Sequence, residues 1–274
     1  MVAKDKQNRP IYQDFDPEAP ETTEFRRIFT RISRRGQTEK MRSLLFTSSE
    51  RGEGKTTSAS MFAMVAALHQ GLRVCLVDAD LHRPRIDKLF EVSKEPGLAE
   101  ILGEELSIEA ALKTTRHETL QVLPAGGRRP FPSELLIPDR LAATFSRLKL
   151  LFDLVVVDAP PLLPVSDPAV LSREVDGVAM VVRAGRTQRD VALRAKKILD
   201  DVGANLLGAI VNNADDVLPY YYGHSYYQYS GYGSDAEKSE KDKEEGGRAP
   251  RGGDAASGRS AKARSRARAS RSSG

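Results

Sequence analysis

The stretch "SLLFTSSERGEGKTTSA", residues 43–59, decides the fold of this chain. It opens with an apolar run that predicts a buried strand, passes through a turn containing Gly52 and Gly54, and ends in residues that suit the start of a helix. A strand, a glycine-rich turn, Gly-Lys-Ser/Thr and a helix, in that order, form a phosphate-binding P-loop. The stretch therefore predicts a nucleotide site at the end of a strand.

The residues of the turn have the chemistry that bound phosphate needs. Gly52 and Gly54 let backbone N–H groups point inward, and the following helix presents its positive end to the anion. Lys55 can reach the β- and γ-phosphates, and the hydroxyl of Thr56 can bind Mg²⁺. Ser49 stands where the motif usually has its first glycine, but the core "GEGKTT" is intact. We expect the nucleotide to be bound by Gly52, Glu53, Gly54, Lys55, Thr56 and Thr57.

The chain up to residue 216 alternates apolar strands with helices. The run "TTEFRRIFTRI", residues 22–32, carries the apolar stripe of an amphipathic helix. Continuous apolar strands separated by helices predict a mostly parallel sheet covered on both faces, so we expect one doubly wound α/β domain over residues 22–216. The expected strands lie within 42–48, 72–78, 119–126, 152–161, 176–185 and 205–213, and the expected helices within 56–71, 133–151 and 187–203.

Three carboxylates follow two of the expected strands. Asp78 and Asp80 end the run "VCLVDAD", and Asp158 ends the run "LVVVD". In open α/β sheets, ligands bind in the crevice at the carboxyl ends of the strands. We therefore expect these carboxylates to converge on Lys55.

Residues 217–233 form a tyrosine-rich cluster. Seven of the chain's eight tyrosines lie in "YYYGHSYYQYSGYG", residues 220–233, among glycine and serine. Residues 234–274 are charged and then Arg-rich, and residues 1–21 are polar without periodicity. Because these tails lack the apolar residues that would offset the entropy cost of ordering, we expect them to be disordered.

The net charge of +4 hides an uneven distribution. Residues 246–274 contain eight Arg and Lys and one acidic residue, a net charge of +7 that leaves −3 for the rest. A mildly acidic globular part argues against a nucleic-acid-binding fold, so no nucleic-acid partner is expected. The single cysteine, Cys75, lies in an apolar run, which favours a small buried hydrophobe and a reducing cytoplasm. No stretch approaches the length of a membrane span.

Three motifs of the chain resemble those of the bacterial tyrosine kinases, a family that controls capsule and exopolysaccharide export. "SSERGEGKTT", "CLVDADLHRP" and "LVVVDAPP" are similar to its Walker A, Walker A′ and Walker B motifs. Segments 123–136, 167–187 and 206–213 resemble family segments in the same order, and the resemblance covers residues 22–233. It implies a P-loop NTPase fold.

The resemblance also implies an activity, namely an ATP- and Mg²⁺-dependent protein-tyrosine kinase that phosphorylates its own C-terminal tyrosines in a neighbouring subunit. Lys55 and Thr56 take the phosphate and Mg²⁺ roles, and Asp78 is the candidate base that faces the acceptor tyrosine. Asp80 organises the metal and counts among the catalytic residues, and Asp158 binds the metal through water. The expected acceptors are Tyr220, Tyr221, Tyr222, Tyr226, Tyr227, Tyr229 and Tyr232.

The partners that the resemblance implies are a transmembrane polysaccharide co-polymerase, whose cytoplasmic segment activates the kinase, and a cognate tyrosine phosphatase. A homo-oligomer is expected, with the protein cytoplasmic and recruited by its partner to the inner face of the plasma membrane. Through this arrangement the kinase would regulate polymerisation and export of capsule or exopolysaccharide.

Some positions depart from the family pattern. His82 stands where the family usually has Arg. In the N-terminal helix motif linked to self-assembly, Glu24 and Arg27 fit, but Thr30 occupies the next position and Arg31 comes one residue late. The Arg-rich tail is also outside the pattern; it is expected to be a solvated extension, and an anchor to an anionic surface or polymer is the alternative.

Two other functions stay open on the sequence. A chromosome-partitioning or septum-placing ATPase would carry a signature lysine where this chain has Glu50, and it would leave the tyrosine row unexplained. A nucleotide-binding regulatory subunit of polysaccharide export would use ATP only to set its assembly state. Formation of phosphotyrosine would separate the kinase from both.

Overall fold

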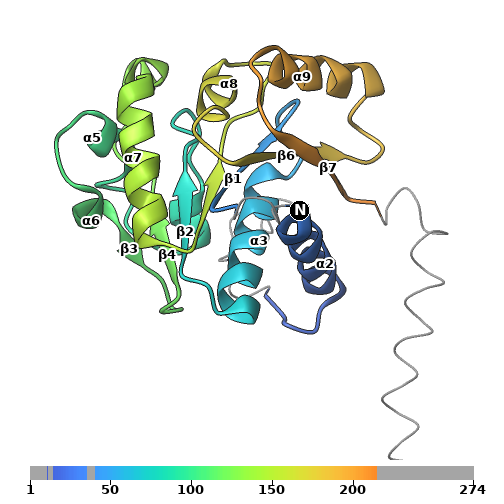
Figure 1. The fold of residues 1–274 in the computed structure, drawn as a ribbon, viewed down its shortest axis with the longest axis horizontal. Helices are drawn as coiled ribbons and strands as arrows, with labels where there is room; N and C mark the ends of the chain where they lie inside the picture. Colours follow the sequence, from blue (N-terminus) through green and yellow to red (C-terminus); the bar gives the residue numbers. More distant parts are fainter. Residues whose placement is uncertain (1–10, 12–14, 36–40, 215–274) are drawn as a thin grey trace, which may run out of the picture. The chain divides into compact units, whose positions relative to one another are not determined.

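The computed structural model describes Ile11, residues 15–35 and residues 41–214. Backbone contacts divide the chain into one unit from Met1 to Pro219 and another from Tyr220 to Gly274, and all described residues belong to the first. The expected phosphate acceptors and residues 234–274 lie outside the described residues, as do residues 1–10 and 12–14 of the N-terminal tail. The first unit is the doubly wound α/β domain that the sequence predicts (Figure 1).

One sheet of seven strands forms the centre of this unit. Its strands run in the order β3-β4-β2-β5-β1-β6-β7, and every neighbouring pair is parallel except β3 with β4. The strands are β1 (Ser43–Ser48), β2 (Val74–Asp78), β3 (Lys113–Thr114), β4 (Leu120–Leu123), β5 (Leu154–Asp158), β6 (Gly177–Arg183) and β7 (Leu206–Asn212).

The central strands are apolar and buried on both faces. Every residue of β1, β2 and β5 is buried, and alternate side chains enter two separate cores. Leu45 and Val77, for example, belong to one core, whereas Leu44 and Leu76 belong to the other. This arrangement explains why the strands read as continuous apolar runs rather than alternating ones.

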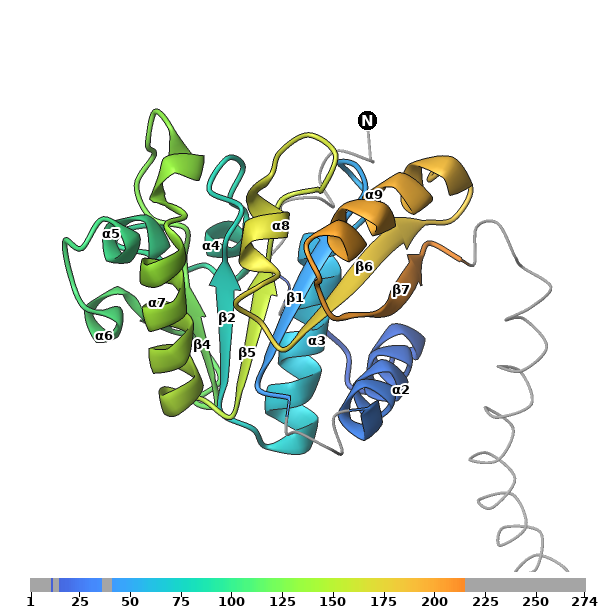
Figure 2. The same ribbon diagram turned by 45° about the horizontal axis from the view of Figure 1, so that its top comes forward.

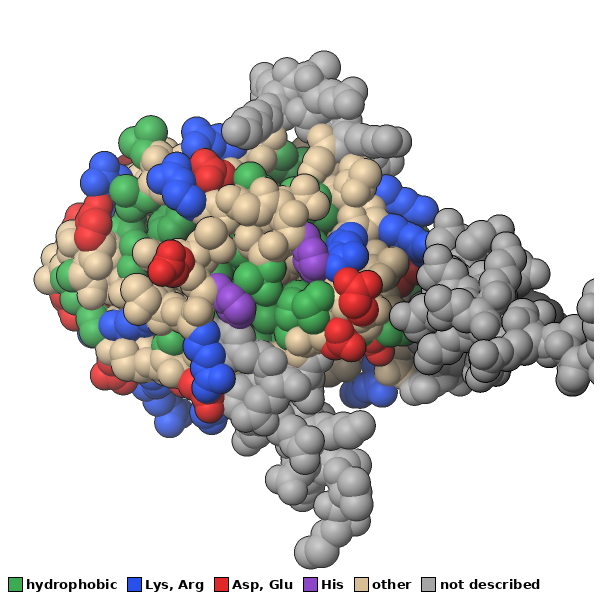
Figure 3. All heavy atoms as spheres, turned by 90° about the horizontal axis from the view of Figure 1, so that it is seen from below, with side chains coloured by type: hydrophobic (Ala, Val, Ile, Leu, Met, Phe, Trp, Pro, Cys, Tyr) green, Lys and Arg blue, Asp and Glu red, His purple; other side chains and the backbone are tan. Residues whose placement is uncertain are grey.

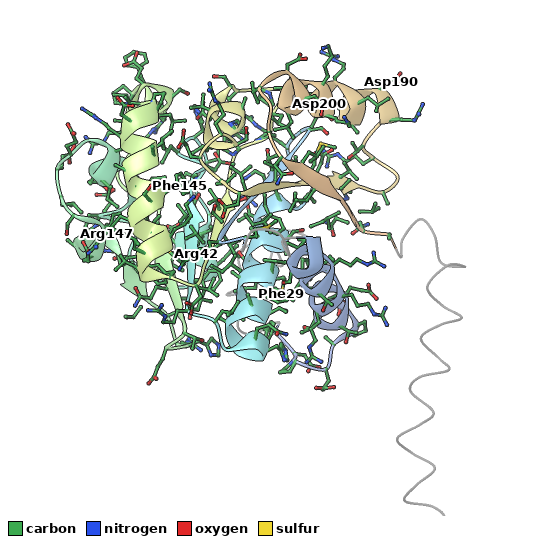
Figure 4. The ribbon with its side chains drawn as sticks, in the orientation of Figure 1. Phe29, Arg42, Phe145, Arg147, Asp190 and Asp200 are labelled. Carbon is green, nitrogen blue, oxygen red and sulfur yellow. The ribbon has the colours of Figure 1, made fainter. Side chains whose placement is uncertain are left out.

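Helices cover the sheet in two layers. The first core packs against α5, α6, α7, α8 and α9, and the second against α2, α3 and α4. Phe29 lies on the side of α2 that faces α3, where its ring centroid is 5.6 Å from that of Phe62 (Figure 4). The helices are α2 (Pro20–Arg35), α3 (Lys55–Gln70), α4 (Ile86–Leu89), α5 (Leu98–Leu102), α6 (Ile108–Ala111), the short 3₁₀ helix η2 (Pro132–Leu135), α7 (Pro138–Leu151), α8 (Asp167–Leu171) and α9 (Arg189–Asp201).

The structure differs from the sequence expectation in several places, among them the four short helices α4, α5, α6 and α8, which were not expected. The first helix begins at Pro20, before the expected boundary at residue 22, and the Thr22 hydroxyl donates to the carbonyl of Asp16 at 2.6 Å. The single helix expected over 133–151 is divided, because Pro138 starts α7 and holds the residue before it in an extended conformation. The two-residue strand β3 was not predicted, since it is too short for a periodic pattern.

The sheet topology puts the P-loop at the middle of the carboxyl edge. β1 lies between β5 and β6. After β1 the chain crosses to β2, on the β5 side of β1, and after β5 it crosses to β6, on the other side of β1. Figure 2 shows β2, β5 and β6 pointing toward the same edge. The crevice expected at such a switch point is therefore bordered by the ends of β1, β2 and β5.

In the view from below, acidic and basic side chains are interspersed rather than gathered (Figure 3).

Candidate active site

The P-loop turn depends on two glycines with a left-handed backbone. Gly52 has a φ of 81° and Gly54 has a φ of 98°, values that residues with a Cβ rarely adopt. Gly54 is also too crowded for a side chain, because a Cβ there would lie 2.0 Å from Nδ2 of Asn212. α3 begins directly after it, at Lys55. The two glycines therefore let the chain turn tightly just before the N-terminus of α3, as a phosphate-binding loop requires.

Lys55, the first residue of α3, contacts carboxylates at the carboxyl ends of β2 and β5. Its Nζ lies 2.9 Å from Oδ2 of Asp80 and 3.4 Å from Oδ1 of Asp158, and it donates to the hydroxyl of Thr56 at 3.3 Å. Both carboxylates are almost fully buried. Of the three carboxylates expected to converge on Lys55, Asp80 and Asp158 contact it directly, and Asp78 is close enough to raise its pKa.

Burial and charge pull the pKa values of this cluster in opposite directions. Burial would lower the pKa of Lys55, but the carboxylates of Asp158 and Asp80 outweigh it and raise that pKa. Burial raises the pKa of Asp158 and Asp80 adds to the rise, whereas Lys55 and a hydrogen bond from the Thr56 hydroxyl oppose it. Lys55 is therefore a fixed cation, and Asp158 holds a proton more readily than a free carboxylate does.

Asp78 is the most deeply buried of the three carboxylates, with no exposed surface. Its Oδ2 accepts hydrogen bonds from the backbone N–H groups of Arg85 and Ile86, both at 3.0 Å, and its Oδ1 accepts one from the N–H of Asp80 at 3.2 Å. Burial and the nearby Asp158 raise its pKa to about 7, although the two N–H donors and Lys55 lower it. Asp78 therefore fixes the loop after β2 and titrates near neutral pH.

Glu53 braces the P-loop from inside. Its carboxylate is buried, accepts the N–H of Glu50 at 2.8 Å, and accepts a second hydrogen bond from the hydroxyl of Thr187. Nδ2 of Asn212 donates to the Glu53 carbonyl at 3.0 Å. Glu53 was expected to contact the nucleotide, and its backbone lies in the turn, but its side chain is committed to these internal contacts.

Two further positions of the loop behave differently from each other. Thr57 is exposed in the first turn of α3, so its hydroxyl is accessible beside the loop. Ser49, which replaces the usual first glycine, is fully buried, and its hydroxyl has no hydrogen-bond partner among the described residues. An orphaned buried hydroxyl within a phosphate loop fits a site that receives a polar ligand.

His82 makes an internal contact in place of the family's usual arginine. Its Nε2 lies 3.0 Å from Oδ2 of the buried Asp167, whose Oδ1 accepts the hydroxyl of Ser133 at 2.7 Å. Ser133 is also 3.4 Å from His82 Nε2. His82 is thus held beside the candidate site by residues from η2 and α8.

Four residues that organise the site could not be identified from sequence motifs. Asn212, Thr187, Ser133 and Asp167 come from segments far from the P-loop. All four lie in the segments 123–136, 167–187 and 206–213 that resemble the family, but the resemblance assigned no role to any of them. Asn212 lies 159 residues from its partner Glu53. Asn212 and Thr187 could have been suspected, because "VNN" and "RAGRT" lie where strands end and turns begin at the carboxyl edge.

The charges of the cluster suit a nucleotide with a divalent cation. Three buried carboxylates face a single lysine, and their excess negative charge requires compensation. Among the described residues, no group of three or more His, Cys, Asp or Glu is arranged to hold a metal ion by itself. Mg²⁺ keeps several waters and binds through one or two carboxylates and substrate phosphates, and Asp80 and Asp158 are the carboxylates that meet beside Lys55.

The chain is similar to proteins named as tyrosine kinases. It is 33% identical over 207 residues to tyrosine-protein kinase YwqD of Bacillus subtilis, which covers 76% of this chain and 87% of that protein. It is 30% identical over 227 residues to the putative tyrosine-protein kinase CapB of Staphylococcus aureus, covering 81% of this chain and 99% of CapB. No protein-family model matches the chain.

Solved structures agree with these relatives. The kinase domain of the Escherichia coli tyrosine kinase ETK superposes with a TM-score of 0.69 at 32% identity, over 72% of this chain and 76% of that domain. The septum site-determining protein MinD of Pyrococcus horikoshii superposes with a TM-score of 0.53 at 23% identity, over 62% of this chain and 69% of that chain. The likeness to MinD shows the shared P-loop fold alone.

Proposed function

The chain belongs to the family of bacterial tyrosine-protein kinases, and on that premise we propose that it is an ATP-dependent kinase that phosphorylates its own C-terminal tyrosines. The observation that carries the proposal is the meeting of Lys55 with Asp80 and Asp158 beside the P-loop turn. A kinase needs a cation for the transferred phosphoryl group and carboxylates for its metal, and both are supplied from separate strand ends.

We propose the following residues for the nucleotide. The backbone of Gly52, Glu53 and Gly54 would surround the phosphates, Lys55 would contact the β- and γ-phosphates, and Thr57 is accessible beside them. The Thr56 hydroxyl, with Asp80 and Asp158, would hold Mg²⁺. Bound Mg²⁺ supplies positive charge that neutralises the phosphate oxygens.

The proposed transfer is an in-line displacement on ATP. A bond forms between the tyrosine oxygen and the γ-phosphorus, the bond from that phosphorus to the bridging oxygen breaks, and ADP leaves with the bond's electron pair. The phenol proton passes to a carboxylate, for which we propose Asp78. Because Asp78 is fully buried and both its oxygens accept backbone N–H groups, this role requires the loop after β2 to move when the tyrosine binds. Its pKa of about 7 matches a general base at neutral pH better than an ordinary aspartate pKa of 3.8 does.

The acceptor tyrosines are proposed to enter the site of a neighbouring subunit. In this scheme a transmembrane co-polymerase activates the kinase from the membrane, a tyrosine phosphatase reverses the reaction, and the cycle regulates polysaccharide polymerisation and export. The described residues contain no helix that is long and apolar enough to cross a bilayer. We propose that the partner recruits the kinase to the membrane.

A mixed-subunit experiment tests the transfer between subunits. A Lys55→Met chain with intact tyrosines is incubated with Mg-ATP and with a second chain whose seven C-terminal tyrosines are changed to Phe. Phosphate on the Lys55→Met chain is the expected result, because only the other chain can supply catalysis. Phosphate only in mixtures where one chain carries both Lys55 and the tyrosines would rule out transfer between subunits. A nucleotide-binding regulatory subunit or a partitioning ATPase would give no phosphotyrosine at all.

A further inference from the structure

A basic cavity lies at the carboxyl ends of β2 and β4, outside the nucleotide cluster. Its volume is about 450 Å³, and its lining includes His82, Lys94, Arg128 and Arg129. The segment 125–130, which follows β4 at the carboxyl edge of the sheet, forms much of its wall. We call it the basic cavity. Its size falls in the range of ligand sites, about 300–1,000 Å³.

The cations of the basic cavity are only partly neutralised by the protein. Arg128 makes no ion pair or hydrogen bond within the described part of the chain. Lys94 has one carboxylate near it, Glu95, at 3.9 Å and on the surface. Arg129 alone is well paired, at 3.3 Å from Glu100 and 2.6 Å from Glu105. Positive charge is therefore left over for a ligand.

Glu100 holds the wall of the basic cavity in a fixed shape. Its carboxylate accepts the N–H of Gly97 at 2.7 Å and the N–H of Gly127 at 2.9 Å, besides pairing with Arg129. The two segments also pack closely, because a Cβ on Gly97 would lie 2.2 Å from the carbonyl oxygen of Pro124. Cations on a fixed wall lose less entropy when they bind than cations on a mobile loop do.

The basic cavity adjoins the proposed catalytic cluster through the loop after β2. His82 lines the cavity and comes two residues after Asp80, which contacts Lys55. Asp167 holds the ring of His82 in place at 3.0 Å. A peptide bound with one side chain in the cavity would therefore have a neighbouring residue close to the cluster.

An exposed aromatic residue lies in the chain between two prolines that line the basic cavity. Phe131 is 69% exposed, and the prolines on both sides of it, Pro130 and Pro132, line the cavity. Among the described residues, the other large hydrophobic side chain with similar exposure is Leu150, on α7. An exposed ring offers a stacking surface to an aromatic side chain.

We propose that the basic cavity binds a phosphotyrosine of the C-terminal tyrosine row. The proposal rests on the proposed function, which supplies phosphotyrosine. Between Tyr220 and Gly233 the row contains no Asp or Glu, so the unmodified row has no charge to complement the cavity. A phosphate adds a charge of about −1.5 to −2 and three acceptor oxygens, which suit Arg128 and Lys94.

Binding of one phosphotyrosine would order the reactions that follow. The tyrosines of the row are close together; Tyr226 and Tyr227 are adjacent, and Tyr229 and Tyr232 follow within five residues of Tyr227. With one phosphate held in the cavity, the next tyrosine is retained near Asp80 and Lys55. The first phosphate on a tail is then the slow one, and later phosphates are added faster.

A binding measurement tests the proposal without ATP, so its outcome does not depend on whether the chain transfers phosphate. The protein is the full chain with its seven C-terminal tyrosines changed to Phe, which removes internal competition. The probes are fluorescein-labelled peptides of residues 220–233, unmodified or phosphorylated at Tyr229, followed by fluorescence polarisation. We expect the phosphopeptide to bind at least about tenfold more tightly, a difference of about 1.4 kcal/mol.

Variants locate the site. Arg128→Ala combined with Lys94→Ala should reduce binding of the phosphopeptide to the level of the unmodified peptide. The control is Arg147→Ala, which removes an exposed arginine of α7 that pairs with Glu109, and it should leave binding unchanged (Figure 4). Equal binding of the two peptides, or full binding by the double variant, would overturn the proposal. So would equal binding of an unmodified peptide of residues 235–245, since general charge attraction would then explain the result.

Discussion

Asn212, near the end of β7, donates a hydrogen bond from Nδ2 to the carbonyl oxygen of Glu53 at a distance of 3.0 Å. A side chain of the last described strand therefore holds the backbone of the P-loop turn. The same amide nitrogen lies where a Cβ on Gly54 would have to go. The shape of the phosphate site thus depends on residues at both ends of the domain sequence.

Asn212→Ala should weaken nucleotide binding because the Glu53 carbonyl loses its side-chain donor. We expect the KM for ATP to rise about fivefold or more and the free energy of unfolding to fall by about 1 kcal/mol. The control is Asn205→Ala, which removes an Nδ2 bond to the carbonyl of Asp176 at 2.7 Å, at the start of β7. That variant should lose similar stability with an unchanged KM. An equal rise of KM in both variants would show that the Asn212 contact has no special role.

Gly54→Ala should abolish most ATP binding. The substitution puts a Cβ into a left-handed residue with φ of 98° and within 2.0 Å of Asn212 Nδ2, so the turn must move. Gly71→Ala is the matched control, because Gly71 also has a positive φ, of 64°, but has open space around its Cβ position. It should cost about 1 kcal/mol of stability and leave ATP affinity unchanged. Equal affinities in a calorimetric titration would contradict this account of the turn.

Thr187→Val should destabilise the P-loop through Glu53. The variant removes the hydroxyl that donates to the buried Glu53 carboxylate and leaves that oxygen with one partner fewer. A loss of about 1–3 kcal/mol in the free energy of unfolding is expected, together with weaker ATP binding. Thr144→Val removes a buried hydroxyl that donates to Arg140 within α7, at 2.7 Å, and serves as the control. It should alter stability without altering ATP binding, and a parallel loss of affinity there would refute the coupling.

Through Asp78, the free energy of unfolding should depend on pH differently from the way it depends on pH through an ordinary aspartate. Its pKa is raised to about 7 in the folded protein, mainly by burial, from an ordinary value of 3.8. The folded state therefore binds the proton more tightly, and its contribution to the free energy of unfolding falls as pH rises from about 4 to about 7. Denaturant unfolding of wild type and Asp78→Asn should show the wild type losing stability relative to the variant over this interval.

Asp176 is a control because its pKa shifts in the opposite direction, so its contribution to the free energy of unfolding should change with pH in the opposite sense. Burial would raise its pKa, but the backbone N–H of Arg42 and the ammonium of Lys149 lower it. Its contribution is therefore present above the ordinary pKa and is lost as pH falls through the folded value. Asp176→Asn should lower the stability measured near neutral pH, and the deficit should shrink in acid. The same pH dependence in both variants would mean that burial does not control Asp78.

The sequence was sufficient for the fold and for the centre of the site. The P-loop, Asp78, Asp80 and Asp158 were predictable because strand ends and glycine turns are local patterns, and a parallel sheet brings such ends together. The residues that hold the P-loop in place from distant segments were not predictable. Thr187 and Asn212 reach Glu53 across 134 and 159 residues, and an ordinary Thr or Asn at a strand end carries no signal of its partner. The roles of the site residues, by contrast, stay predictions that the variants above are designed to test.

The measurement that tests the central claim most directly is phosphosite mapping after incubation with Mg-ATP. The purified full chain, supplied with the cytoplasmic segment of its activating partner, is compared by mass spectrometry with Lys55→Met, which removes the cation at the meeting point of Asp80 and Asp158. We predict phosphate on tyrosines between Tyr220 and Tyr232 in the wild type and none in Lys55→Met. A wild-type chain without phosphotyrosine, or equal phosphorylation of both proteins, would contradict the account.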